Sequence, residues 1–115
     1  HLLEMCQGSG TCASVEVDRV QTLPGVQTYH AQGMVPGGTK RNHASYGQHV
    51  EVAKGYQQDL LCDPQTSGGL LVSVVPEHAP AVQALLASQG LPDVPVGRML
   101  AQGETWEGGV TVKCE

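Results

Sequence analysis

Two segments rich in glycine and small polar residues have the composition that an anion-binding site needs. The first segment is 33–42 and the second is 63–71. Adjacent glycines allow positive φ angles and a close approach of the backbone to a ligand, and successive backbone N–H groups can then surround an anion. The candidate residues that would face a substrate are Gly37, Gly38, Thr39, Arg41, Asn42, Asp63, Gln65, Thr66, Ser67, Gly68 and Gly69.

The same composition also suits two tight turns that bind nothing. Neither segment carries the lysine-serine ending of a P-loop. The residues alone therefore leave two interpretations open, a phosphate site or a pair of structural turns. In a phosphate site, Lys40 or Arg41 would supply positive charge beside the backbone amides.

The histidines and cysteines form no recognisable metal motif. Cys6 and Cys12 are separated by five residues, which is outside the spacing typical of zinc ligands, and the chain has no Cys-x-x-Cys. Cys62 could be a reactive thiol, but a small residue at the end of an apolar run is more typical of a buried structural position. We therefore predict no metal site in this chain.

Hydrophobic periodicity predicts helices and strands on both sides of the two segments. We expect a helix end at 1–7 closed by 8–10, a strand with one buried face at 11–18, a short helix at 24–33 and a loop at 34–49. Residues 50–62 are ambiguous, and 63–69 form a second loop.

The rest of the chain predicts a second group of elements. The nearly continuous apolar run 70–75 is typical of a buried central strand. A helix is expected at 76–88 and strands at 94–101 and 109–113, with a turn at 107–109. Because strands and helices interleave, we predict an α+β fold with α/β layering.

Composition restricts the size of the domain and its partners. The chain has 115 residues, a mass of 12.1 kDa and a formal net charge of −5, so it has room for one small domain and is poorly suited to bind nucleic acid. No apolar run approaches the ~18 residues of a membrane-spanning helix. No signal peptide is visible, so we expect free thiols and a cytoplasmic location.

The second segment, from Asp63-Pro64-Gln65-Thr66-Ser67-Gly68-Gly69 to Leu70-Leu71, resembles the signature of the selenophosphate synthetase family, also called selenide, water dikinase. The first segment, Gly33 through Pro36-Gly37-Gly38-Thr39 to Arg41-Asn42, resembles a second block of that family. Further matches are 1–10, 23–25 and 97–98. The resemblance covers nearly the whole chain, and the nine-residue block is highly specific.

The resemblance implies a longer two-domain parent enzyme that uses ATP, Mg²⁺, selenide and water to make selenophosphate, AMP and orthophosphate. In that family the catalytic cysteine or selenocysteine, its partner lysine and the metal-binding aspartates lie upstream of the part matched here. The resemblance therefore implies no catalytic residue, no metal ligand and no bound cofactor in this chain alone, and isolated it would be inactive.

The resemblance also implies a domain organisation. Residues 1–115 would form most of the C-terminal domain, similar to that of aminoimidazole ribonucleotide synthetase and partly ferredoxin-like, and the N-terminal ATP-binding domain would be absent. The expected partners are that domain, small-molecule substrates and a second copy in a homodimer, with no nucleic acid and no membrane. The alternative is a free-standing, non-catalytic phosphate-binding or scaffold domain.

Overall fold

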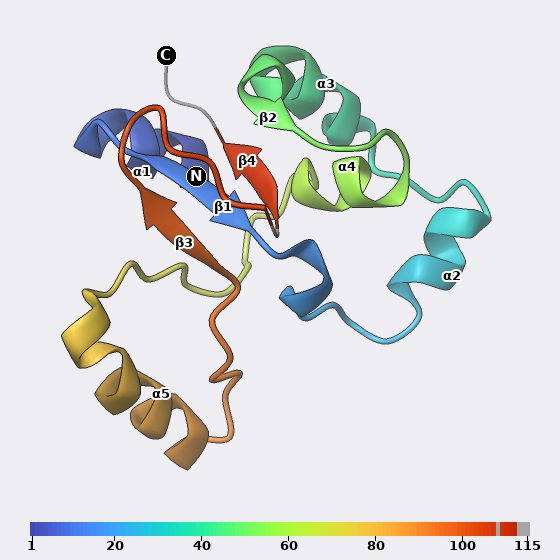
Figure 1. Cartoon of the computed structure of the whole chain (residues 1–115). Coiled ribbons are helices and arrows are strands. Elements are labelled where there is room, and N and C mark those ends of the chain that lie inside the picture. The colour runs from blue at the N-terminus through green and yellow to red at the C-terminus, as the bar shows by residue number, and fades with distance from the viewer. Residues whose placement is uncertain (108, 113–115) are drawn as a thin grey trace.

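The centre of the molecule is a four-stranded antiparallel sheet with strand order β2-β4-β1-β3. The computed structural model describes residues 1–107 and 109–112 (Figure 1). The strands are β1 (Cys12–Val15), β2 (Val50–Glu51), β3 (Gly97–Leu100) and β4 (Val110–Val112). Together with the helices around it, this sheet confirms the predicted α+β fold class.

Helices make up most of the remaining regular structure. The α-helices are α1 (Leu2–Ser9), α2 (Val26–Ala31), α3 (Gly37–Tyr46), α4 (Tyr56–Leu61) and α5 (Ala79–Ser88). Short 3₁₀ helices cover Val17–Arg19, Gly47–His49 and Pro76–His78. In Figure 1, α2, α3 and α4 gather on one side of the sheet, whereas α5 stands apart from them.

The predicted helix at the start of the chain is confirmed as α1, and its end is set by glycine. Gly10 has φ 64°, and its backbone N–H donates to the Cys6 carbonyl. This left-handed closure suits a residue without a Cβ. Leu3 and Cys6 of α1 pack with the strand residues Ala13, Val15 and Val112 in the hydrophobic core.

The strand predicted at 11–18 is confirmed only over Cys12–Val15 as β1, because Val17–Arg19 form a 3₁₀ helix, and β1 has no exposed face. All four residues of β1 are buried. The strand lies between β3 and β4, and residues of α1 pack against its side chains. A Cβ on Gly109 would come within 2.6 Å of Ser14 Oγ, so the face that carries Ser14 is buried as well. The predicted pattern of one buried face was wrong.

The loop predicted at 34–49 was wrong, because most of it is helical. Pro36 is the N-cap of α3, and the helix continues through Gly37 and Gly38 although glycine has a low helix propensity. Thr39 in its first turn is 1% exposed. Tertiary packing therefore stabilises a helix that the local sequence disfavours.

The buried central strand predicted at 70–75 was also wrong. The segment belongs to no strand, and Leu70, Val72 and Val75 are 96%, 64% and 56% exposed. Both sides of β1 are already taken by β3 and β4. The central position beside β1 is therefore filled, and the apolar run lies outside the sheet in spite of its composition.

The last two predicted strands are confirmed with shorter bounds, as β3 and β4. They do not pair with each other. Ser14 pairs with Arg98 on one side and with Thr111 on the other, so β1 separates the two strands. Residue 108 in the predicted turn and residue 113 in the predicted strand lie outside the described residues.

Candidate anion-binding site

The two glycine-rich segments of the sequence meet at the beginning of α3. A Cβ on Gly38 would lie 2.8 Å from Cγ of Pro64, so the proline ring packs directly on this glycine. Asn42 Nδ2 donates a hydrogen bond of 3.0 Å to the Cys62 carbonyl oxygen. The fold therefore joins the first segment to the beginning of the second, although about one fifth of the chain separates them.

The first turn of α3 has the electrostatics of an anion site. The N-cap Pro36 provides no side-chain cap, and no acidic residue occurs in the first turn. The leading amides of a helix carry a partial positive charge that favours anions. The Arg41 guanidinium adds to it, because its Nη2 lies 3.6 Å from the position of a Cβ on Gly38.

Thr39 adds an unusual polar group to this turn. Its side chain is buried, and within the described part of the chain its Oγ1 has no hydrogen-bond partner. A buried hydroxyl without a partner costs about 1–3 kcal/mol. Thr39 Oγ1 is therefore a buried polar atom of this turn whose hydrogen bonding is incomplete within the described residues.

The remaining predicted residues of the second segment are more exposed to solvent. Asp63 is half-buried, whereas the residues from Gln65 to Gly69 are exposed. The Gln65 Oε1 atom lies beside Gly68, 2.8 Å from the position of a Cβ there. Within the described residues, the hydrogen bond between the segments runs from Asn42 to Cys62 and does not involve Thr66 or Ser67.

A contact between two helices beside this site was not indicated by the sequence. His30 Nε2 of α2 lies 2.8 Å from Asp59 Oδ2 of α4, and the ring of Tyr56 meets the imidazole edge-on at a centroid distance of 5.2 Å. The partners are 29 residues apart and belong to no motif. No pattern in the sequence could have indicated this contact.

Cys62 is poorly suited to be a nucleophile. Partial burial raises the pKa of its thiol, and the nearby Asp59 carboxylate raises the pKa further. Both effects favour the protonated thiol, whereas nucleophilic cysteines need a lowered pKa. The position is consistent with the structural role expected for this residue.

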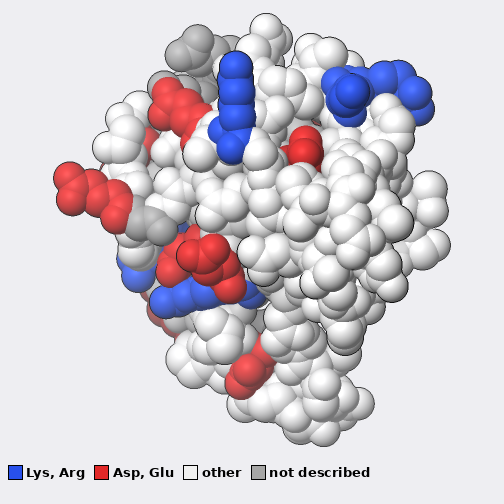
Figure 2. All heavy atoms as spheres, turned by 90° about the vertical axis from the view of Figure 1, so that its right-hand side faces the viewer, with Lys and Arg blue, Asp and Glu red and all other residues white. Residues whose placement is uncertain are grey.

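Figure 2 views the molecule from the side on which α2, α3 and α4 lie in Figure 1. Most of this face is uncharged, and one group of basic side chains stands apart from the acidic ones. Such an arrangement suits a site for an anionic ligand more than a broad nucleic-acid surface. No helix among the described residues combines the length and apolar character needed to cross a membrane.

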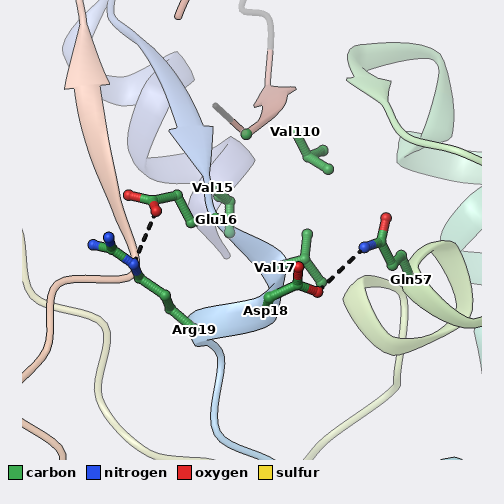
Figure 3. A pocket seen from close by; sticks show the side chains of 8 residues that line it. Val15, Glu16, Val17, Asp18, Arg19, Gln57 and Val110 are labelled. Atoms are coloured by element: carbon green, nitrogen blue, oxygen red, sulfur yellow. Dashed lines mark hydrogen bonds and ion pairs between the residues drawn. The ribbon is translucent and has the colours of Figure 1, made fainter. Parts of the chain in front are cut away.

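A separate cavity of about 330 Å³ lies where β1 ends, between α4 and β4 (Figure 3). Its charged groups are already engaged, because Arg19 Nε lies 2.9 Å from Glu16 Oε2 and Gln57 donates to Asp18 at 3.5 Å. Among residues 1–107 and 109–112, no group of three His, Cys, Asp or Glu side chains could hold a metal ion. The described residues therefore do not fit a Mg²⁺ site.

The fold and the site define the class of this protein: it is an α+β domain in which two glycine-rich segments meet at the start of a helix. The sequence matches the family described as AIR synthase related protein, C-terminal domain, over residues 1–106. The chain belongs to this family.

Curated relatives make the relationship more specific. The chain is 52% identical over 101 residues to the selenide, water dikinase of Colwellia psychrerythraea, which corresponds to 88% of this chain and 29% of that protein. It is 49% identical over 100 residues to the same-named protein of Escherichia coli O6:H1, and 48% identical over 99 residues to that of Yersinia pestis. The similarity confirms the resemblance, and the chain spans about 29% of the length of these relatives.

Proposed function

We propose that this chain is the C-terminal domain of a selenide, water dikinase. The parent enzyme would use ATP, selenide and water to form selenophosphate, AMP and orthophosphate in the cytoplasm, as a homodimer. The identity of about half of the aligned residues to proteins of that name supports this proposal. So does the match to a C-terminal domain family over nearly the whole chain.

Within that enzyme, the start of α3 and the second glycine-rich segment would form one wall of the ATP cleft. They would receive a phosphate group of ATP or of the selenium-bearing product. The main observation in support is the buried Thr39 hydroxyl, which has no hydrogen-bond partner among the described residues. It lies in a helix start that lacks acidic residues and has Arg41 beside it. A phosphate oxygen would accept a hydrogen bond from this hydroxyl.

The roles proposed for this domain and for the rest of the parent enzyme follow from the chemistry of phosphoryl transfer. That reaction needs precise positioning and neutralisation of charge more than covalent participation of the protein. This domain would contribute backbone amides, the Thr39 hydroxyl and the Arg41 charge. Mg²⁺ would neutralise phosphate charge when bound, but its ligands are expected in the rest of the parent enzyme, together with the catalytic cysteine or selenocysteine.

The test is a pair of variants in the full-length parent enzyme. Thr39→Val replaces the hydroxyl by a methyl group of similar size, and Thr39→Ser keeps the hydroxyl as the matched control. If the hydroxyl binds phosphate, Thr39→Val should raise the KM for ATP about 10-fold, the value of one hydrogen bond to a charged group, and Thr39→Ser should stay near the wild type.

The stability of the same variants gives an independent readout. Without ligand, Thr39→Val should unfold at an equal or higher temperature, because it removes a buried polar group that has no partner. An unchanged KM for ATP in Thr39→Val, together with this stabilisation, would contradict the assigned site and favour a scaffold domain.

A further inference from the structure

The pair of His30 and Asp59 connects α2 to α4. The side chains are 24% and 30% exposed and lie 2.8 Å apart. Tyr56, one helical turn before Asp59, places its ring edge-on to the imidazole, with 74° between the ring planes. One face of α4 therefore holds the imidazole through two side chains.

The two helices that this pair connects are anchored very differently. α4 is attached to the hydrophobic core, because Leu60 and Leu61 pack against the buried cluster. In contrast, none of the residues of α2 is buried. Hydrophobic packing therefore fixes the position of α2 weakly, and the contact with His30 is the specific one that ties it to α4.

The position of α2 determines where α3 starts. The connection between the helices is short and hydrogen-bonded, since Met34 N–H donates to the Tyr29 carbonyl at 3.0 Å and Val35 N–H donates to the Gly33 carbonyl at 3.0 Å. The next residue is Pro36, the N-cap of α3. A displaced α2 would therefore displace the first turn of α3.

The other side of the site is fixed by α4. The helix ends at Leu61, the next carbonyl accepts the hydrogen bond from Asn42, and Pro64 packs on Gly38. The ion pair thus joins the two stretches of chain that lead into the site, one just before α3 and the other just before the second glycine-rich segment.

We propose that His30 and Asp59 are positioning residues of the anion site, which hold α2 on α4 and so set where α3 begins relative to Pro64. This inference rests on the proposed function of that site. A half-buried hydrogen-bonded pair suits the role, because removal of one partner leaves the polar group of the other without its hydrogen bond. Positioning matters here because a displaced helix start would no longer hold its backbone amides and the Thr39 hydroxyl where a bound phosphate needs them, which weakens binding.

The experiment compares His30→Leu with His30→Gln in the full-length parent enzyme, well below the unfolding temperature of each variant. Leucine cannot bond to Asp59, whereas the glutamine amide can still donate. We expect His30→Leu to raise the KM for ATP about 10-fold or more, as for the loss of at least one hydrogen bond to a charged group, with the KM for selenide unchanged. His30→Gln should recover most of the affinity for ATP.

A merely structural role would give a different pattern. Loss of folded enzyme lowers the apparent kcat and leaves both KM values unchanged, so that result with His30→Leu would overturn the inference. If His30→Leu does not fold, Asp59→Leu provides the same test from the other side, because leucine cannot bond to the imidazole. An unchanged KM for ATP in Asp59→Leu would then also overturn it.

Thr39→Val, measured in the same assay, separates this inference from the proposed function. If Thr39→Val raises the KM for ATP and His30→Leu does not, the anion site stands and the positioning role is wrong. If neither variant changes the KM for ATP, the site itself is wrong and the inference fails with it. Effects of both that are less than additive would support the inference, because the residues would act on one site.

Discussion

Gly38 shows how a single residue couples the two halves of the candidate site. It is the second residue of α3, and Pro64 occupies the space into which a Cβ would project. Gly37, its neighbour in the same helical turn, has open space at the corresponding position. The two glycines therefore have different reasons to be present, and substitution can distinguish them.

We expect Gly37→Ala and Gly38→Ala to change stability in opposite directions. Gly37→Ala should stabilise the chain by up to about 0.5–1 kcal/mol, because alanine loses less entropy in a helix. Gly38→Ala should destabilise it by about 1–3 kcal/mol, because the proline ring must move away. Urea unfolding of both variants measures this, and equal effects would contradict the contact between Gly38 and Pro64.

The Cys62 thiol gives a prediction that depends on pH. Because burial and Asp59 raise the pKa of this thiol, its alkylation should be slow at neutral pH and should accelerate only above the ordinary range of a thiol. Asp59→Asn removes the negative charge, which lowers the pKa and should speed alkylation at a given pH. Peptide mapping by mass spectrometry measures modification at this cysteine, and slower alkylation in Asp59→Asn would contradict the assignment.

At the scale of elements, the segment 70–75 is the feature with the clearest consequence. Its composition is that of an internal strand, yet its leading residue Leu70 is 96% exposed. Leu3 of α1, in contrast, is 7% exposed and belongs to the core. The same substitution at these two leucines therefore tests the placement of the segment.

Leu3→Ala should cost about 2–5 kcal/mol, the usual range for a leucine removed from a core. Leu70→Ala should change the free energy of unfolding by less than about 0.5 kcal/mol, as expected for an exposed position. Chemical denaturation of both variants measures the difference. A loss of comparable size at Leu70 would mean that the segment is buried in solution, as its composition indicates.

At the scale of the whole molecule, the chain is expected to need the rest of its parent enzyme for activity. The described residues contain no cluster that could hold a metal ion, and the chain spans about 29% of its curated relatives. On the proposed function, the domain would offer a binding surface for one substrate group, and the rest of the reaction centre would come from the parent enzyme.

We expect the purified chain to release no AMP from ATP in the presence of selenide and Mg²⁺. The full-length parent, assayed in parallel, provides the positive control. Detection of AMP above the background of a heat-denatured sample, and its loss on Thr39→Val, would show that this domain catalyses a reaction by itself and would contradict the division of labour proposed above.

The sequence by itself determined the fold class, the helices α1, α2 and α5, the strands β1, β3 and β4, and the family. These features depend on local signals. Glycine closes α1 at a left-handed turn, periodicity marks the helices, and a nine-residue block identifies the relatives. The two glycine-rich segments were also evident, because their composition is unusual over a short stretch.

Only the tertiary structure decided how these parts meet. Gly37 and Gly38 disfavour a helix locally, yet contacts with α4 and Pro64 make α3 helical. The apolar run 70–75 lies outside the sheet, whose central positions are occupied by β4 and β1. His30 and Asp59 come together across 29 residues. Such contacts depend on which partners are adjacent in space, and local sequence carries no information about that adjacency.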